Sequence, residues 1–310
     1  MKNLLSSVII FNFQLSFFNL FRTFGSQNSN IMRLHNETNY SVQALQEKII
    51  GNLKAIHQVC QEHNLRYYLW AGSMLGAVRH KGFIPWDDDM DIAMPRPDYE
   101  ELMSHWREWL PKPYEVICAE NDATYPYPFA KIEDVSTVVL ERPDFKFLEG
   151  VYIDIFPIDG VPADDAERKS HFKKYKFWRH LLFLHGRDPF KHGHGPRSWY
   201  PWLIHNIFSL QGLQRRVKQL MTKYDYDSSE YVCDYDDGIS GTIEKRLLGT
   251  PKEYPFSDTV FLGVEHYDEY LTNKYGNYMQ LPPKEKQVQH HFYRLDLNLS
   301  YRDTSIEELL

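Results

Sequence analysis

The residues of this sequence most able to do chemistry are the acids in the stretch IPWDDDMDIAM, residues 84–94. If residues 89–94 form a strand, their side chains alternate, so Asp89 and Asp91 share one face while Met90 and Ile92 share the other. Two neighbouring carboxylates repel each other, and their placement costs stability unless a cation neutralises them. Carboxylate oxygens are ligands that Mg²⁺ and Mn²⁺ prefer. The pattern therefore predicts a site for one of these metals.

Two other interpretations of the acidic run fit less well. Three successive acids are commonly a solvated turn, but Ile84 and Trp86 before the run and Met94 after it indicate burial. The acids also match the first three ligand positions of an EF-hand loop. Such a loop needs glycine where Ile92 stands and a bidentate glutamate where Asp98 stands, so this assignment fails.

A further carboxylate lies far from this run along the chain. Residues 151–156, VYIDIF, are β-branched and aromatic and predict a central strand with Asp154 in its middle. A carboxylate in such a strand must be paired, protonated or metal-bound, because an isolated buried charge is too costly. We interpret Asp154 as a metal ligand or catalytic group, with a structural salt bridge as the alternative.

A predicted turn precedes the acidic run. Residues 65–70 have the pattern of a buried strand, Gly72 and Ser73 break it, and residues 74–79 have the pattern of a short helix that Ser73 would cap. The first turn of a helix leaves backbone N–H groups without partners, and these bind anions such as phosphate. An ordinary connection between a strand and a helix is the alternative.

Several basic residues are candidate phosphate contacts. Lys131 lies near the end of a predicted strand, and Arg79, His80 and Lys81 follow the predicted turn. A phosphoryl donor carries negative charge that a metal alone does not offset. Lys131 is equally well explained as a solvated surface lysine, and the other three as partners of the aspartates.

Three stretches together resemble one known family. They are AGSMLGAVRHKGFIPWDDDMDIAMPRPDYEEL, YIDIFPID and YGNYMQLPP. These resemble the LicD family of bacterial phosphocholine transferases, which are related to fukutin and fukutin-related protein. The similarity spans about residues 40–295. It implies an α+β fold, with a nucleotidyltransferase-like mixed β-sheet flanked by helices and an added helical C-terminal region.

The resemblance also implies roles for individual residues. Gly72 and Ser73 match the phosphate turn of the family. Asp89 and Asp91 match its D-x-D metal pair and Asp154 its third carboxylate, and Asp87 corresponds to an acid present in family motifs. One departure is Asn277, where many relatives have aspartate.

The same resemblance implies a metal-dependent transfer of a phospho-alcohol group. The donor would be a CDP-alcohol such as CDP-choline, the released product CMP, and the acceptor a sugar hydroxyl of a cell-surface glycan, lipopolysaccharide or lipid-linked sugar. Two alternatives stay open: nucleotidyl transfer to a small molecule, and a non-catalytic glycan- or nucleotide-binding protein on the same scaffold.

Composition sets the broad class. The 310 residues are 43% hydrophobic, enough for one large domain or two small ones. We divide them into an N-terminal extension (1–36), a nucleotidyltransferase-like core (37–160) and a helical substrate or acceptor region (161–310). The formal charge of −7 argues against a nucleic-acid partner. Three cysteines without a C-x-x-C pair favour a reducing, cytoplasmic location, with association at the inner face of the membrane as a further expectation.

The N-terminal extension is unlike the rest. Residues 4–21 are apolar and rich in phenylalanine, but polar residues interrupt them, so they are marginal for a membrane span. No small-x-small cleavage site marks a signal peptide. We interpret the extension as disordered or as an upstream translation artefact, with a weak membrane anchor as the alternative.

Periodicity and capping residues predict the remaining elements. These are helices over 42–63, 98–110, 164–184, 198–224 and around 265–275, and short strands over 115–118 and 129–132. Ser41 can cap the first of these helices, and a capping-box pattern at Asp98 opens the second. The aromatic stretch WYPWLIHNIFSL, which belongs to the helix predicted at 198–224, is interpreted mainly as core, with contact to a membrane interface as the alternative. His192 and His194 lie in a loop without further ligands at usable spacing, so we assign no metal to them.

Overall fold

A computed structural model describes residues 41–310 except 143, 145–146, 192, 288 and 290–291. The helices are α3 (Val42–Glu62), α4 (Ala71–His80), α5 (Arg96–Trp109), α6 (Asp165–His185), α7 (Pro196–Ile207), α8 (Leu210–Met221), α9 (Tyr267–Tyr275) and α10 (Ile306–Leu309). The strands are β1 (Tyr68–Leu69), β2 (Asp91–Pro95), β3 (Tyr114–Ile117), β4 (Ala130–Leu140), β5 (Glu149–Val161), β6 (Tyr231–Asp234), β7 (Ile243–Glu244), β8 (Lys252–Phe256), β9 (Thr259–Gly263) and β10 (Arg294–Asp296).

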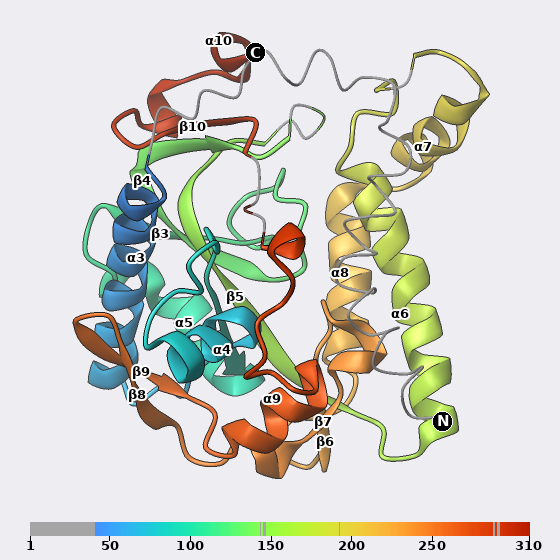
Figure 1. Ribbon diagram of the computed structural model, residues 1–310. Coiled ribbons are helices and arrows are strands. Elements are labelled where there is room, and N and C mark those ends of the chain that lie inside the picture. Colours follow the sequence, from blue (N-terminus) through green and yellow to red (C-terminus); the bar gives the residue numbers. More distant parts are fainter. Residues whose placement is uncertain (1–40, 143, 145–146, 192, 288, 290–291) are drawn as a thin grey trace.

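The strands form one mixed sheet with helices packed around it, which confirms the α+β class (Figure 1). Its main path runs β10-β4-β5-β2-β1-β9-β8, with β3 paired to β4 and β6 paired to β5. Strands β2 and β5 are parallel, as are β1 and β9, while the other pairs are antiparallel. The long strand β5 lies between β4 and β2, where its β-branched and aromatic side chains are covered on both sides.

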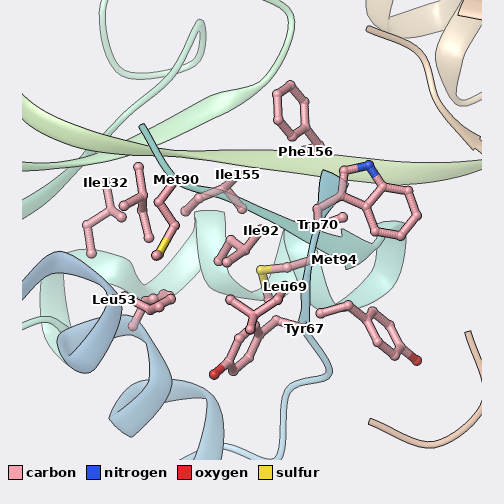
Figure 2. Close-up of a cluster of buried hydrophobic side chains, with 14 of the residues drawn as sticks. Leu53, Tyr67, Leu69, Trp70, Met90, Ile92, Met94, Ile132, Ile155 and Phe156 are labelled. Atoms are coloured by element: carbon pink, nitrogen blue, oxygen red, sulfur yellow. The ribbon is translucent and has the colours of Figure 1, made fainter. Parts of the chain in front are cut away.

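The main core lies between the sheet and the helices α3, α4 and α5 (Figures 1 and 2). Helix α3 is capped by Ser41, whose side chain accepts a hydrogen bond from the Ala44 N–H, as the sequence predicts. Its apolar stripe includes Leu53, which is fully buried. Ile92 of β2 and Ile155 of β5 lie opposite each other in the sheet and are also fully buried. Adjacent strands thus fill the same core.

Helices α6, α7 and α8 form a separate layer beside the sheet (Figure 1). They share a second apolar cluster, which includes Leu182, Leu213 and Val217. The single helix predicted at 198–224 is wrong, because the chain turns at Phe208 and starts a new helix. Ser209 caps that helix by accepting a hydrogen bond from the Gly212 N–H.

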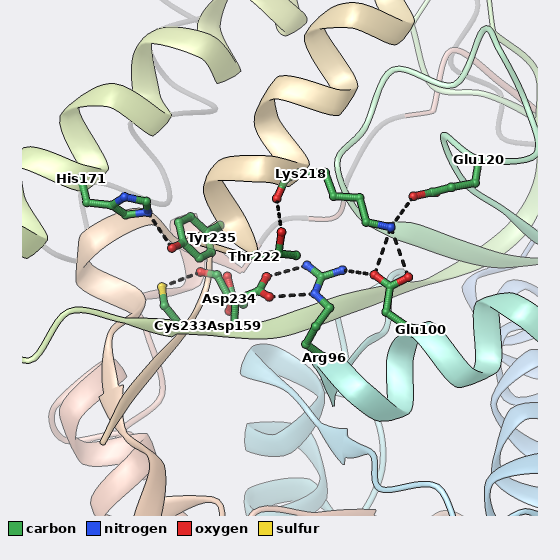
Figure 3. Close-up of polar contacts among 10 residues, drawn as sticks. All are labelled: Arg96, Glu100, Glu120, Asp159, His171, Lys218, Thr222, Cys233, Asp234 and Tyr235. Atoms are coloured by element: carbon green, nitrogen blue, oxygen red, sulfur yellow. Dashed lines mark hydrogen bonds and ion pairs between the residues drawn. The ribbon is translucent and has the colours of Figure 1, made fainter. Parts of the chain in front are cut away.

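A chain of ion pairs joins this helical layer to the sheet (Figure 3). The Arg96 guanidinium contacts both oxygens of the buried Asp159 on β5 and one oxygen of Glu100 on α5. Lys218 of α8 contacts Glu100 at 3.0 Å and Glu120 at 2.7 Å. The charges of Asp159 are therefore paired, as a buried carboxylate requires.

Several predicted boundaries shift for identifiable reasons. The strand predicted at 65–70 is short, Tyr68–Leu69. The predicted capping box at residue 98 is wrong: α5 begins at Arg96, and the Asp98 carboxylate instead accepts hydrogen bonds from the Arg66 backbone and guanidinium. The strand predicted at 129–132 extends to residue 140, because residues 138–140 pair with β10.

The region after residue 160 is less helical than expected, since it also supplies β6 to β10 of the same sheet. The boundaries proposed at residues 36 and 160 stay a prediction. Residues 1–36 and His192 lie outside the described residues. Cys60, Cys118 and Cys233 are buried free thiols. Among the described residues, no helix combines the length and apolarity needed to span a membrane.

Truncating the core should destabilise the protein strongly. Ile155→Ala removes a fully buried side chain from β5, and such changes cost about 2–5 kcal/mol in the free energy of unfolding. Val260→Ala on β9 changes a partly exposed side chain and is the control, with an expected loss below about 1 kcal/mol. Denaturant unfolding of both variants measures the difference. Equal losses would contradict the placement of β5 in the core.

Candidate active site

Three charged side chains lie in register across three neighbouring strands. Asp91 of β2 is the register partner of Asp154 of β5, and Asp154 is the register partner of Lys131 of β4. Register partners project from the same face of a sheet, so the three groups form one row. The two carboxylates that lie 63 positions apart in the chain are thus side by side, as the sequence predicted.

The acidic run lies at the start of β2. The strand begins at Asp91, two residues later than predicted, although the Asp154 N–H still bonds to the Met90 carbonyl at 3.0 Å. Met90 and Ile92 are buried in the core, while Asp89 and Asp91 are half-buried. The predicted alternation between faces is therefore confirmed.

The site raises the pKa values of its carboxyl groups. Burial, together with the negative charges of Asp89 and Asp154, raises the pKa of Asp91 well above its usual range. Burial also raises the pKa of Asp154 to about 7, with Glu141 and Asp89 adding to the shift and Lys131 opposing it. The Asp154 Oδ1 atom is buried and has no hydrogen-bond partner among the described residues. Like charges here are brought together at a cost in stability.

Lys131 is buried, so a solvated surface lysine is excluded: its side chain is 2% exposed. The Nζ atom lies 2.8 Å from Glu149 Oε2, 3.8 Å from Glu141 Oε1 and 3.9 Å from Asp154 Oδ1. It also lies 3.3 Å from the centroid of the Tyr152 ring, a cation–π contact. Burial by itself lowers the pKa of Lys131, but the three carboxylates outweigh it and raise that pKa, so the ammonium stays charged.

The predicted Gly72-Ser73 turn lies beside the acids. It forms the first turn of α4, which begins at Ala71 with Trp70 as its N-cap. The prediction that Ser73 caps this helix is therefore wrong. Its hydroxyl instead accepts a hydrogen bond from the Asp91 N–H at 2.8 Å, and this bond ties α4 to β2.

Asp87 lies against the same turn. A Cβ atom placed on Gly72 would be 3.4 Å from Asp87 Oδ2. Because glycine has no side chain, the backbone of the turn stays open to a ligand at this point. The first turn of α4 thus faces the acidic run, as an anion site next to a metal site requires.

Arg79 and Lys81 lie at the opposite end of α4. The Arg79 guanidinium donates to the Tyr278 carbonyl at 2.7 Å and to the His80 ring at 2.8 Å. Burial lowers the pKa of Arg79, while the charge of Asp87 partly counters that shift, so these two residues are in electrostatic reach. Lys81 is exposed in the left-handed region at φ 58°. Their contact with phosphate stays a prediction.

Sequence reasoning missed a second group of polar residues from the last third of the chain. Lys274 of α9 pairs with Asp237, and its positive charge lowers the pKa of Asp91 against the dominant effect of burial. Asp234 of β6 accepts a hydrogen bond from the Trp70 indole, next to the start of α4. Lys274 directly precedes the YGNYM stretch used for the resemblance, and this proximity was the available signal.

The donor set suits a divalent cation. Asp89, Asp91 and Asp154 supply hard oxygen ligands, and a cation would relieve the repulsion that adds to the effect of burial on the pKa values of Asp91 and Asp154. In the described part of the chain, no three histidine, cysteine or acidic side chains are arranged to hold an ion as they stand.

Removing the positive charge of the buried Lys131 should destabilise the fold. Lys131→Met keeps the length of the side chain but leaves Glu149 buried without its partner, which costs about 3–5 kcal/mol in the free energy of unfolding. Adding Glu149→Gln to this variant should recover part of the loss, because the uncompensated charge is removed. Denaturant unfolding tests both variants. A loss below about 0.5 kcal/mol for Lys131→Met would show that this ion pair does not support the site.

Comparison with known proteins agrees with this geometry. Residues 64–192 match the family profile described as LicD/FKTN/FKRP, nucleotidyltransferase domain. The lipopolysaccharide cholinephosphotransferase LicD of Haemophilus influenzae is 32% identical over 254 residues, covering 77% of this chain and 91% of that protein. An uncharacterised protein of Rickettsia prowazekii is 31% identical over 128 residues, 40% of this chain and 45% of its own. Since the match to the Haemophilus protein extends over most of both chains, this chain belongs to the LicD family.

Proposed function

We propose that this protein transfers phosphocholine, or a similar phospho-alcohol group, from a CDP-activated donor such as CDP-choline to a sugar hydroxyl of a cell-surface glycan or lipopolysaccharide, releasing CMP. The observation that carries the proposal is the row of Asp91, Asp154 and Lys131 beside the first turn of α4. The Haemophilus relative, named as a lipopolysaccharide cholinephosphotransferase, supports the choice of group and acceptor. The buried free thiols support a cytoplasmic location.

In this proposal Asp89, Asp91 and Asp154, with Asp87 nearby, hold Mg²⁺ or Mn²⁺. When bound, such an ion neutralises charge on the diphosphate and on the departing CMP oxygen. The first turn of α4, at Gly72 and Ser73, binds a phosphate through its backbone N–H groups.

The sugar hydroxyl attacks the phosphorus atom that carries the choline. A new phosphorus–oxygen bond forms to the sugar, the bond to the bridging oxygen breaks, and CMP leaves. Asp154 completes the metal shell or accepts the hydroxyl proton. Its pKa of about 7 and an Oδ1 atom that has no hydrogen-bond partner among the described residues support the second role, because a general base works best with a pKa near the operating pH.

Neutralising either acid of the D-x-D pair should abolish turnover without unfolding the protein. Asp89→Asn and Asp91→Asn should lower CMP release from CDP-choline by several orders of magnitude, because each removes a metal ligand. Thermal stability should hold or rise in Asp91→Asn, since repulsion is relieved. Asp258→Asn, which changes an exposed acid paired with Lys54, is the matched control. CMP release at the wild-type rate in either site variant would contradict the assignment.

Asp154→Asn separates a catalytic from a structural role. We expect a loss of turnover as large as in Asp91→Asn, with the fold retained, because Asp154 lies in the same row. CMP release and thermal unfolding should be measured on the same sample. Reduced thermal stability with turnover preserved would favour the structural salt bridge.

Chelation tests the metal directly. Treatment with EDTA should stop CMP release, and added Mg²⁺ or Mn²⁺ should restore it, because without the cation the three carboxylates repel the negatively charged diphosphate. Phosphorus NMR of the product shows which phosphate moved. A product carrying CMP, with free phosphocholine released, would mean nucleotidyl transfer and would overturn the proposed reaction. Turnover unaffected by EDTA would contradict the proposed dependence on a metal ion.

A further inference from the structure

Helix α7 exposes most of its large apolar side chains. Trp199 is 66% exposed and Ile207 is 61% exposed, and Tyr200, Trp202 and Leu203 lie on the same outward arc. Of the twelve residues in α7, only Ser198 and Ile204 are buried. The interpretation of this stretch mainly as core is therefore wrong.

This face lies at the edge of the molecule. Helix α7 is at the upper right in Figure 1, away from the strands that carry the acids. At 100° per residue, the outward arc contains one polar residue, Asn206, among the five apolar ones. A continuous exposed apolar face of this kind marks an interaction surface.

The layer that carries α7 is basic, although the protein is acidic. Residues 164–223 contain thirteen Lys and Arg against four Asp and Glu, in a chain whose net charge is −7. Exposed members of this set include Lys173 and Lys174 on α6, Arg197 on α7 and Arg215 on α8. The excess of positive charge in this layer favours a negatively charged partner.

We propose that the exposed face of α7 docks on an anionic lipid surface. Tryptophan and tyrosine prefer the boundary between headgroups and acyl chains, where the ring is buried and its N–H or O–H group stays wet. Lysine and arginine near such a helix bind lipid phosphates. Both features occur together in this layer. The helix lies in the plane of the interface, and no helix of the described residues is suited to cross it.

This inference uses none of the acidic residues of the active site, so it is independent of the proposed reaction. If the acceptor is attached to a lipid, docking through α7 also brings the protein to its acceptor. That link alone rests on the proposed function.

Vesicle binding by the full chain tests the inference. Sedimentation should be measured with vesicles of phosphatidylglycerol and phosphatidylcholine, and with phosphatidylcholine alone. Wild-type protein should bind the anionic vesicles, and added salt should weaken this binding because the Debye length shortens. The combined variant Trp199→Ser, Trp202→Ser and Leu203→Ser should bind at least about tenfold more weakly, since apolar burial anchors the helix. All three side chains are exposed, so far-UV circular dichroism should be unchanged.

A matched control removes exposed apolar groups elsewhere. Val260→Ser, Met279→Ser and Leu281→Ser together change three exposed side chains outside α7 and should leave vesicle binding as in the wild type. CMP release from the soluble donor should also be unchanged in the α7 variant, so a failed vesicle assay and a failed reaction are told apart.

Three results would overturn the inference. They are no binding of the wild type to anionic vesicles, equal binding by the α7 variant, and a wild-type dimer that the α7 variant converts to a monomer. The last would mean that a second copy of the chain covers this face.

Discussion

The structure depends on two carboxylates held side by side by the pairing of parallel strands. Asp91 and Asp154 are register partners, so the hydrogen bonds between β2 and β5 keep their Cα atoms side by side. Backbone pairing thus opposes electrostatic repulsion. Repulsion between the two carboxylates is unfavourable, and in the proposed function a divalent cation would relieve it.

The protein limits this cost by placing cations on two sides of the row. Lys131 lies next to Asp154 on β4, and Lys274 approaches Asp91 from α9. Each lysine is also paired with a further acid, Glu149 or Asp237, so no buried ammonium is left alone. Because each lysine already neutralises an acid of its own, the row of carboxylates keeps a net negative charge.

Much of the site was predictable because it depends on local patterns. Alternation placed Asp89 and Asp91 on one face, and the β-branched residues around Asp154 identified a central strand. The acidic and glycine-serine stretches are close in sequence, and their contact follows from a short connection. The position of Asp154 beside Asp91 followed only from the resemblance, since strand order is not encoded in local periodicity.

The remaining features depend on contacts between distant segments. Nothing near Lys131 shows that Glu149 would bury it, and Ser73 looked like a cap because its bond to Asp91 is a tertiary contact. The aromatic residues of α7 were misassigned for a related reason. An amphipathic pattern shows that one face differs from the other, but it does not show which face meets solvent.

The order of strands has a consequence for how the chain folds during synthesis. The short strand β1, which leads into α4, has β2 on one side and β9 on the other, with Leu69 opposite Gly263. The Tyr270 hydroxyl also accepts a hydrogen bond from the Ala71 N–H at the start of α4. A nascent chain therefore exposes one unpaired edge of β1 until residues near 270 have left the ribosome. Assembly of the catalytic centre is a late event in translation, and premature termination upstream of β9 should yield an aggregation-prone product instead of a smaller working enzyme.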